Sequence, residues 1–132
     1  MIVVDTNVIA YLRLPGPLTG AAEQLLAIDE DWAAPLLWHS EFRNVLAGAV
    51  KRQALSLEGA AAIAREAEKQ FKGREYSVDS AQVLMLASLS GCSSYDCEFV
   101  ALARDLDVPL VTNDREVLKA FPAVAVPLDR YS

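Results

Sequence analysis

The sequence predicts an α/β fold with a central, mainly parallel sheet of about five strands and helices on both faces. Two observations support this. Short apolar or β-branched runs recur along the chain, and most segments between them have helical periodicity. The length of 132 residues matches one compact domain, and no repeat or linker divides it, so we expect a single domain over residues 1–132. The expected strands lie at residues 2–4, 32–34, 76–78, 110–112 and 124–126.

Two of the expected helices have clear boundary residues. Asp79 and Gln82 have the spacing of a capping box, and Gly91 is well placed to end the same helix. Ser56 is a candidate N-cap for an Ala-rich helix over residues 57–72. The charged residues of this second helix fit a solvated face, so we expect it to serve packing or partner contact rather than chemistry.

Composition and charge exclude several classes of protein. The 53% hydrophobic and 23% charged fractions are those of a folded chain and not of a disordered one. The formal charge of -6 is unlike that of a dedicated nucleic-acid binder, so a polyanionic substrate would have to be met locally, with a bound cation offsetting part of the charge. Cys92 and Cys97 are too few for a zinc site or a disulfide framework, so we expect two reduced, partly buried thiols. No apolar run approaches the roughly 18 residues of a membrane span, which favours a soluble, cytoplasmic protein.

Four acidic residues lie where the surrounding apolar pattern makes an unpaired charge costly: Asp5, Glu41, Asp96 and Asp114. A divalent cation is a partner that several of them can share. Asp5 and Asp114 each follow an expected strand, and ligands of parallel α/β sheets collect beyond the carboxyl ends of the strands. Either residue alone also fits a simple role as N-cap of the helix that follows it.

Glu41 lies on an expected helix whose apolar stripe includes Trp38, Phe42 and Val45. At about 100° per residue, the Glu41 side chain falls on the flank of this stripe and away from Arg43. A carboxylate on the flank of a buried face needs a partner. A cation is one such partner, and a salt bridge to a neighbouring Lys or Arg is the alternative.

Asp96 opens a second helix, with an apolar stripe that includes Tyr95 and Phe99. It shares an angular sector with Val100, whereas Glu98 points roughly 160° away from it. We therefore take Asp96 as the ligand and Glu98 as a residue at the surface or behind the ligands. An interaction with the positive end of the helix dipole is the alternative for Asp96.

The types of these residues indicate which metal would bind. Hard divalent cations prefer oxygen ligands, so a set of carboxylates with no histidine fits Mg²⁺ or Mn²⁺ better than Zn²⁺. His39 is the single histidine of the chain. It lies two residues before Glu41, which on a helix directs the two side chains to different faces, so we expect a structural role for His39.

The acidic residues and their neighbours resemble a known family, the PIN-domain ribonucleases, and within it the VapC-type toxins of prokaryotic toxin–antitoxin pairs. The matching segments are residues 2–7 (IVVDTN), 40–46 (SEFRNVL), 95–103 (YDCEFVALA) and 110–114 (LVTND). Their order and spacing and the length of the chain agree with that family, and the likeness covers essentially the whole chain. No acidic residue of the family pattern is missing.

The resemblance implies a three-layer α/β/α sandwich and a metal-dependent endoribonuclease in which Mg²⁺ or Mn²⁺ activates water to cleave RNA. Carried over by position, the catalytic and metal-binding residues are Asp5, Glu41, Asp96 and Asp114. The residues expected to hold these carboxylates or water by hydrogen bonds are Thr6, Asn7, Thr112 and Asn113, which also fit helix caps or turns.

The resemblance also implies partners. Arg13, Arg43 and Arg115 are candidates for RNA contact, although each also fits an ordinary solvated charge. VapC-like proteins are typically neutralised by a small antitoxin over the active-site groove, and they commonly form homodimers, so we expect a homodimer or a toxin–antitoxin hetero-oligomer. Trp38 and Leu36 are apolar residues that fit either such an interface or the core.

Two other functions compete with the nuclease. The first is a PIN-like module that binds metal or a protein partner without cleaving RNA. The second is a phosphotransfer domain of the receiver or aspartate-nucleophile phosphatase type, which also places an aspartate after its first strand. Residues 5–7 (DTN) supply neither the adjacent pair of acids nor the Asp-x-Asp pair that these domains use.

Overall fold

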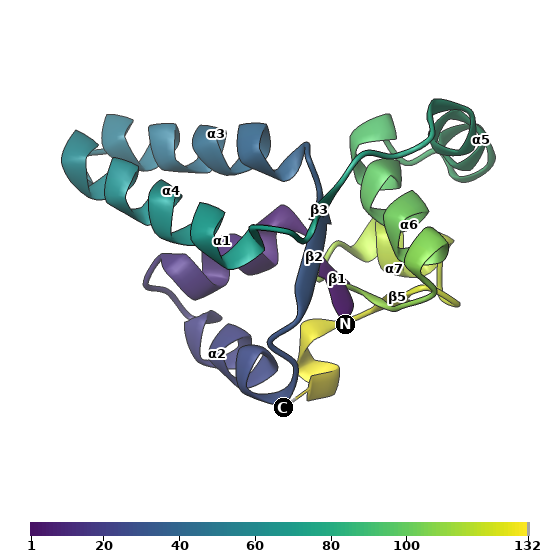
Figure 1. The fold of residues 1–132 in the computed structure, drawn as a ribbon, viewed down its shortest axis with the longest axis horizontal. Coiled ribbons are helices and arrows are strands. Elements are labelled where there is room, and N and C mark those ends of the chain that lie inside the picture. Colours follow the sequence, from purple (N-terminus) through teal and green to yellow (C-terminus); the bar gives the residue numbers. More distant parts are fainter. Residues whose placement is uncertain (132) are drawn as a thin grey trace.

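The computed structural model describes residues 1–131 and has a five-stranded sheet at its centre (Figure 1). All strands are parallel, in the order β3-β2-β1-β4-β5, which confirms the expected fold class. The strands are β1 (Ile2–Val4), β2 (Trp32–Pro35), β3 (Glu75–Tyr76), β4 (Leu110–Val111) and β5 (Ala125–Val126). Each strand overlaps an expected strand, and its two ends differ from the expected ends by at most two residues.

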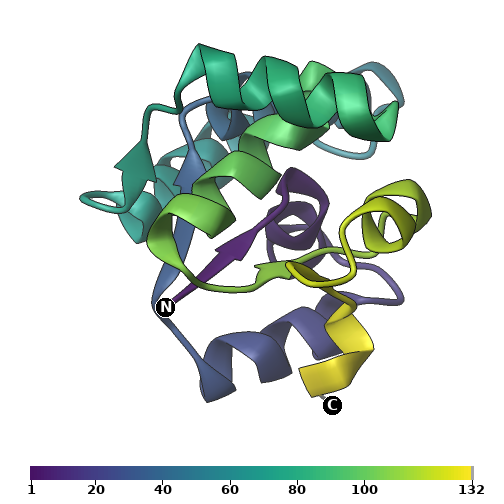
Figure 2. The same ribbon diagram turned by 90° about the vertical axis from the view of Figure 1, so that its right-hand side faces the viewer.

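Helices cover both faces of the sheet, so the fold has the three layers that the sequence predicted. Figures 1 and 2 show one layer made by the first four helices and another made by the next three. The first layer contains α1 (Thr6–Arg13), α2 (Thr19–Ile28), α3 (Trp38–Lys51) and α4 (Leu57–Phe71). The second contains α5 (Ser80–Ser90), α6 (Ser94–Leu106) and α7 (Arg115–Ala120), and a 3₁₀ helix, η1 (Leu128–Tyr131), packs against α2.

The predicted helix boundaries are confirmed by the contacts at the helix ends. The Asp79 carboxylate accepts a hydrogen bond from the backbone N–H of Gln82 at the start of α5. Gly91 ends that helix with φ of 75°, a left-handed conformation that a side chain would strain. Ser56 caps α4 by accepting a hydrogen bond from the backbone N–H of Gly59. These local signals fix where the helices begin and end.

The core lies on both sides of the sheet because helices cover both faces. Residues of β1 and β2 are buried throughout, which is why these strands are continuously apolar. Trp38 is buried against Phe71, with ring centroids 4.9 Å apart, so it belongs to the core and not to an interface, whereas Leu36 is exposed. Tyr95 is 60% exposed, and its expected place in the buried stripe of α6 was wrong, because that stripe begins at Cys97 and Phe99.

The two cysteines are in the state that the sequence predicted. Cys92 and Cys97 are free and buried, as expected of reduced thiols. Among residues 1–131, no helix has both the length and the apolar character to cross a membrane.

The strand order determines where a ligand can bind. From β1 the chain moves outward through β2 to β3 on one side of the sheet, and then crosses back to β4 and β5 on the other side. The direction therefore reverses between β1 and β4. In doubly wound sheets a crevice opens at this reversal, beyond the carboxyl ends of the two strands. Residues 5 and 112–114 follow these two strands and lie at that crevice.

Candidate active site

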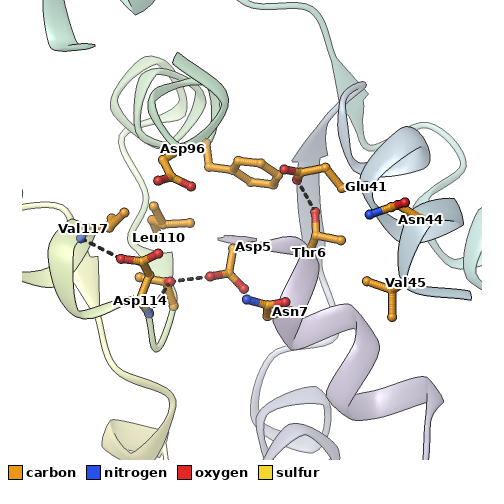
Figure 3. Close-up of a pocket in the computed structure, with 12 residues that line it drawn as sticks. Asp5, Thr6, Asn7, Glu41, Asn44, Val45, Asp96, Leu110, Asp114 and Val117 are labelled. Carbon is orange, nitrogen blue, oxygen red and sulfur yellow. Dashed lines mark hydrogen bonds between the residues drawn. The ribbon is translucent and has the colours of Figure 1, made fainter. Parts of the chain in front are cut away.

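A pocket of about 250 Å³ opens beyond the carboxyl ends of β1 and β4 (Figure 3). All four acids selected from the sequence line it. Asp96 and Asp114 face Asp5, and Glu41 approaches from α3 on the opposite side. The lining residues are Asp5, Thr6, Asn7, Glu41, Asn44, Val45, Asp96, Phe99, Leu110, Thr112, Asp114 and Val117. Four segments that are distant in sequence, residues 5–7, 41–45, 96–99 and 110–117, thus contribute side chains to one pocket.

Asp5 lies at the centre of the pocket and is held from two sides. Its Oδ1 accepts a hydrogen bond of 3.0 Å from the backbone N–H of Val8, which makes Asp5 the N-cap of α1. Its Oδ2 accepts a hydrogen bond from the Thr112 hydroxyl. The pKa of Asp5 is raised to about 6, chiefly by burial and also by the nearby charges of Asp114 and Glu41, while its hydrogen bonds to Thr112 and Val8 act in the opposite direction. Asp5 therefore caps α1 and also lines the pocket. Its role as an N-cap is compatible with a place among the acidic residues of the site.

Asp114 also combines a cap with a place in the pocket. Its Oδ1 accepts hydrogen bonds from the backbone N–H groups of Glu116 and Val117, at 2.9 and 3.1 Å, and so begins α7. Its own backbone N–H donates to Thr112 Oγ1 over 3.0 Å. Because Thr112 also donates to Asp5, one threonine positions both acids.

Glu41 is fixed by a residue at the start of α1. The Thr6 hydroxyl donates a hydrogen bond of 2.7 Å to Glu41 Oε1. This bond joins the residue that follows Asp5 to the first turn of α3, so Glu41 faces the pocket and is not paired with a Lys or Arg. Asn44, which the sequence-based selection of site residues missed, also lines the pocket. The signal for it was its spacing, because three residues after Glu41 a side chain lies on the same helical face.

Asp96 lies in the first turn of α6 and is not the cap of that helix. Ser93 is the N-cap, and its hydroxyl accepts a hydrogen bond from the backbone N–H of Asp96. Partial burial raises the pKa of Asp96, and the negative charges of Asp114 and Glu116 raise it further. Asp114 therefore raises the pKa of both Asp5 and Asp96. Crowded carboxylates of this kind repel one another unless a cation is present.

The comparison with known families agrees with this arrangement. The sequence model of the PIN-domain family matches residues 2–124 of this chain. The chain belongs to the PIN-domain family. The strand order differs from the 2-1-3-4-5 order of receiver-like domains, which excludes the receiver alternative, and the match to the PIN domain over residues 2–124 favours the PIN family over the phosphatase type.

Relatives of this PIN domain include a VapC protein. Ribonuclease VapC3 of Pyrobaculum aerophilum is 29% identical over 129 residues, which cover 96% of this chain and 98% of VapC3. The expected resemblance to VapC-type PIN proteins is thereby confirmed. The crystal structure of PAE2754 from the same organism superposes with a TM-score of 0.78 at 20% identity, covering 98% of this chain and 91% of that one. A toxin–antitoxin complex from Klebsiella pneumoniae contains a chain with a TM-score of 0.68 at 16% identity, covering 97% of this chain and 98% of that one.

Other residues selected from the sequence differ in where the PIN fold places them. Thr6 and Thr112 are buried and hold acids, and Asn7 lines the pocket. Asn113 instead accepts a hydrogen bond from the backbone N–H of Leu128 and does not line the pocket, because its side chain ties β4 to the segment after β5. The predicted structural role of His39 agrees with its contacts, a 2.7 Å contact to Glu75 and stacking on the Trp38 ring.

The three arginines proposed for RNA contact do not line the pocket. Arg13 lies at the end of α1, where its guanidinium donates a 2.6 Å hydrogen bond to Gln70 on α4. Arg43 and Arg115 are exposed and lie beside the pocket residues Asn44 and Asp114 in sequence. Only these last two are close along the chain to residues that line the pocket.

The pocket residues suit a hard divalent cation by their chemistry. The ionisable side chains are all carboxylates, and two of them, Asp5 and Asp96, have pKa values that are raised mainly by burial and further by neighbouring carboxylates. Among residues 1–131, no three Asp, Glu, His or Cys side chains are close enough to ligate one ion directly. Mg²⁺ commonly keeps several water ligands and uses few carboxylates, so the residues present fit it without such a cage.

Proposed function

We propose that this PIN-domain protein is a divalent-metal-dependent endoribonuclease that acts as the toxin of a toxin–antitoxin pair. The observation that carries the proposal is the convergence of Asp5, Glu41, Asp96 and Asp114 on one pocket at the point where the strand order reverses. The name of the relative, Ribonuclease VapC3, supports the choice of RNA as substrate. These four acids are proposed as both the catalytic and the metal-binding residues.

In the proposed mechanism, each protein residue positions a ligand or a water molecule. Thr112 holds the Asp5 carboxylate through its hydroxyl and the start of the Asp114 segment through the backbone. Thr6 orients Glu41 in the same way from the other side. Asp96 lines the pocket from the first turn of α6, where a hydrogen bond from the Ser93 side chain opposes the effect of burial on the pKa of its carboxyl group. Hydrogen bonds of this kind fix the carboxylates before the substrate binds.

A bound Mg²⁺ or Mn²⁺ would lower the pKa of a water molecule and neutralise charge on the phosphodiester. The residues that would hold it, directly or through its water ligands, are Asp5, Glu41, Asp96 and Asp114. No protein nucleophile is then required.

The direct test is cleavage of total cellular RNA by the purified chain, freed of any copurified protein. We expect fragments with Mg²⁺ or Mn²⁺, none with EDTA and none from an Asp96→Asn variant that remains folded. A matched control is Glu23→Gln, which removes one exposed carboxylate on α2 that does not line the pocket. A folded protein that binds metal but cuts no RNA would overturn the nuclease proposal in favour of a PIN-like binding module.

The proposal of an antitoxin partner rests on the similarity of fold to a solved toxin–antitoxin complex. A chain of the solved toxin–antitoxin complex has the same fold as this chain over 97% of its length, which supports an antitoxin partner. From the family resemblance we propose that a segment of this antitoxin lies over the acidic pocket. We also propose a homodimer or a toxin–antitoxin hetero-oligomer. Coexpression with the gene product encoded beside it should abolish both cleavage and toxicity, and light scattering of the purified protein should report a mass above 14.3 kDa.

A further inference from the structure

A second groove lies beside the acidic pocket, at the same edge of the sheet. It has a volume of about 410 Å³ and is lined by Leu36, Tyr76, Ser77, Val78, Ser80, Val83, Leu84, Ser94 and Glu98. Leu36 directly follows β2, and Tyr76 is the last residue of β3. The groove therefore occupies the carboxyl ends of β2 and β3, while the acidic pocket occupies those of β1 and β4.

One helix turn connects the two sites. Asp96 and Glu98 both lie near the start of α6, two residues apart, and their side chains enter different sites. The negative charge of Glu41, which lines the acidic pocket, acts on Glu98 in the groove. A chain that passes through the acidic pocket can thus continue into the groove without leaving the protein surface.

The polar side chains of the groove form no hydrogen bonds with the rest of the described protein. In the described residues, the Tyr76 and Ser80 hydroxyls and the Glu98 carboxylate make no hydrogen bond or ion pair, and the same holds for Ser77 and Ser94. In the acidic pocket, by contrast, Thr6 holds Glu41 and Thr112 holds Asp5 by hydrogen bonds between side chains. The groove therefore presents free hydrogen-bonding groups on an apolar floor made by Val78 and Val83.

The charge of the groove indicates which part of an RNA it suits. It contains no Lys or Arg, so it offers nothing to a phosphate, and its carboxylate would repel one. An unpaired base is uncharged, has an apolar face and carries hydrogen-bonding groups on its edge. Tyr76 supplies an aromatic ring on which a base can stack, and Glu98 supplies an acceptor for N–H groups.

Resting on the ribonuclease function proposed above, we propose that this groove binds one unpaired base next to the scissile phosphate and prefers guanine. Guanine has two adjacent N–H donors on its Watson–Crick edge, at N1 and N2, and it is the one common RNA base with that pair. A carboxylate accepts such a pair with both oxygens. Glu98 is then the residue that determines base preference, and Tyr76 is the stacking residue.

The first experiment measures cleavage preference by sequencing the ends of fragments from a pool of short, unstructured RNAs. The wild-type protein should favour guanine at one position beside the cut. Glu98→Gln should lower that preference by roughly 10-fold, the discrimination of about one bidentate contact, while cleavage of RNAs without guanine there stays unchanged. Glu23→Gln is the matched control, because it removes one exposed carboxylate that does not line either site. A preference equal to that of the wild type in Glu98→Gln would overturn the proposal.

A second experiment does not depend on cleavage and separates failure of the groove from failure of the nuclease. Labelled oligonucleotides that carry one guanine at successive positions are bound to an Asp5→Asn variant, and the position that gives the highest affinity is identified. The guanine at that position is then replaced by inosine, which lacks the N2 amino group. Replacing guanine by inosine should weaken binding to the Asp5→Asn protein several-fold. The same replacement should have no effect on binding to the Asp5→Asn, Glu98→Gln double variant. Tyr76→Ala should weaken binding at every base, whereas Tyr76→Phe keeps the ring and should bind normally.

The outcomes are distinct. If the wild type cuts no RNA but inosine and Glu98→Gln show the expected coupling, the groove binds guanine and the nuclease proposal fails. If RNA is cut but neither Glu98→Gln nor inosine changes preference or binding, the guanine proposal fails alone. If Glu98→Gln and Tyr76→Ala leave RNA binding intact but release the antitoxin, the groove is a protein-docking surface and the base proposal is overturned.

Discussion

The Thr112 hydroxyl donates a hydrogen bond to Asp5 Oδ2, although the two residues are 107 positions apart in the sequence. The same hydroxyl oxygen accepts a hydrogen bond from the backbone N–H of Asp114. Thr112 is 1% exposed, so both contacts form in a region that water reaches poorly. A single buried threonine therefore couples the end of β1 to the end of β4 and positions two of the four acids.

Replacement of Thr112 by valine tests this coupling. Thr112→Val keeps the shape of the side chain but leaves the Asp114 N–H without its acceptor, so we expect a loss of about 1–3 kcal/mol in unfolding free energy. Metal affinity and the cleavage rate should fall by roughly 10- to 100-fold, as is typical when a residue that orients a metal ligand is lost. Thr112→Ser keeps the hydroxyl and should retain most of both. Equal activity in the valine and serine variants would show that the hydroxyl does not orient Asp5.

The crowding of the four acids predicts that divalent cations stabilise the fold. A ligand that binds only the folded state at 100 times its dissociation constant adds about 2.7 kcal/mol. The melting temperature should therefore rise by several degrees when Mg²⁺ or Mn²⁺ is titrated into metal-free protein. Differential scanning fluorimetry measures this directly, with Asp5→Asn expected to reduce the shift and Glu23→Gln expected to preserve it. A melting curve that does not respond to either ion would contradict the proposed metal site.

The raised pKa of Asp5 predicts how stability depends on pH without metal. The folded protein holds the Asp5 proton up to about pH 6, whereas the unfolded chain releases it near the ordinary value of 3.8. Between these values the folded state binds more protons, so its stability falls as pH rises from about 4 to 6 and the loss persists above 6. The full loss from this group is on the order of 3 kcal/mol.

Chemical denaturation in EDTA at several pH values checks this prediction. Between pH 4 and 6 the unfolding free energy of the wild type should fall relative to that of Asp5→Asn. Above pH 6 the difference between the two proteins should be constant. A saturating divalent cation should reduce the change, because it neutralises the ionised carboxylate. A difference that does not vary with pH would show that burial does not raise the Asp5 pKa.

Glu75 provides a contrasting test, because its role is structural. Its Oε1 accepts a 3.1 Å hydrogen bond from the Trp38 indole N–H and lies 2.7 Å from His39 Nε2. Glu75→Leu leaves the buried indole N–H unpaired, which should cost about 1–3 kcal/mol of stability. The cleavage rate well below the melting temperature should stay close to that of the wild type. The control is Glu68→Leu, whose carboxylate lies 3.6 Å from the other ring nitrogen and is more exposed, so we expect a smaller loss.

Local patterns in the sequence determined the strands, the helix boundaries and the identity of the four acids. These depend on short-range rules: apolar runs bury themselves in a sheet, Ser56 and Asp79 satisfy the first N–H groups of a helix, and Gly91 accepts a left-handed conformation. The acids were visible because a carboxylate in an apolar context requires a compensating partner. The resemblance to the PIN-domain family rested on those same residues.

Only the tertiary structure decided which side chains share a site. The pairing of Thr112 with Asp5 and of Thr6 with Glu41 depends on strand order and helix crossing, which no local pattern specifies. Asn113 has the same kind of sequence position as Thr112, yet it bonds to Leu128 instead, because successive residues beyond a strand point in different directions. Glu98 likewise lines a separate groove and not an open surface, since the ends of β2 and β3 bring Tyr76 and Leu36 beside it. Sequence determines which residues need a partner, and packing determines which partner each one meets.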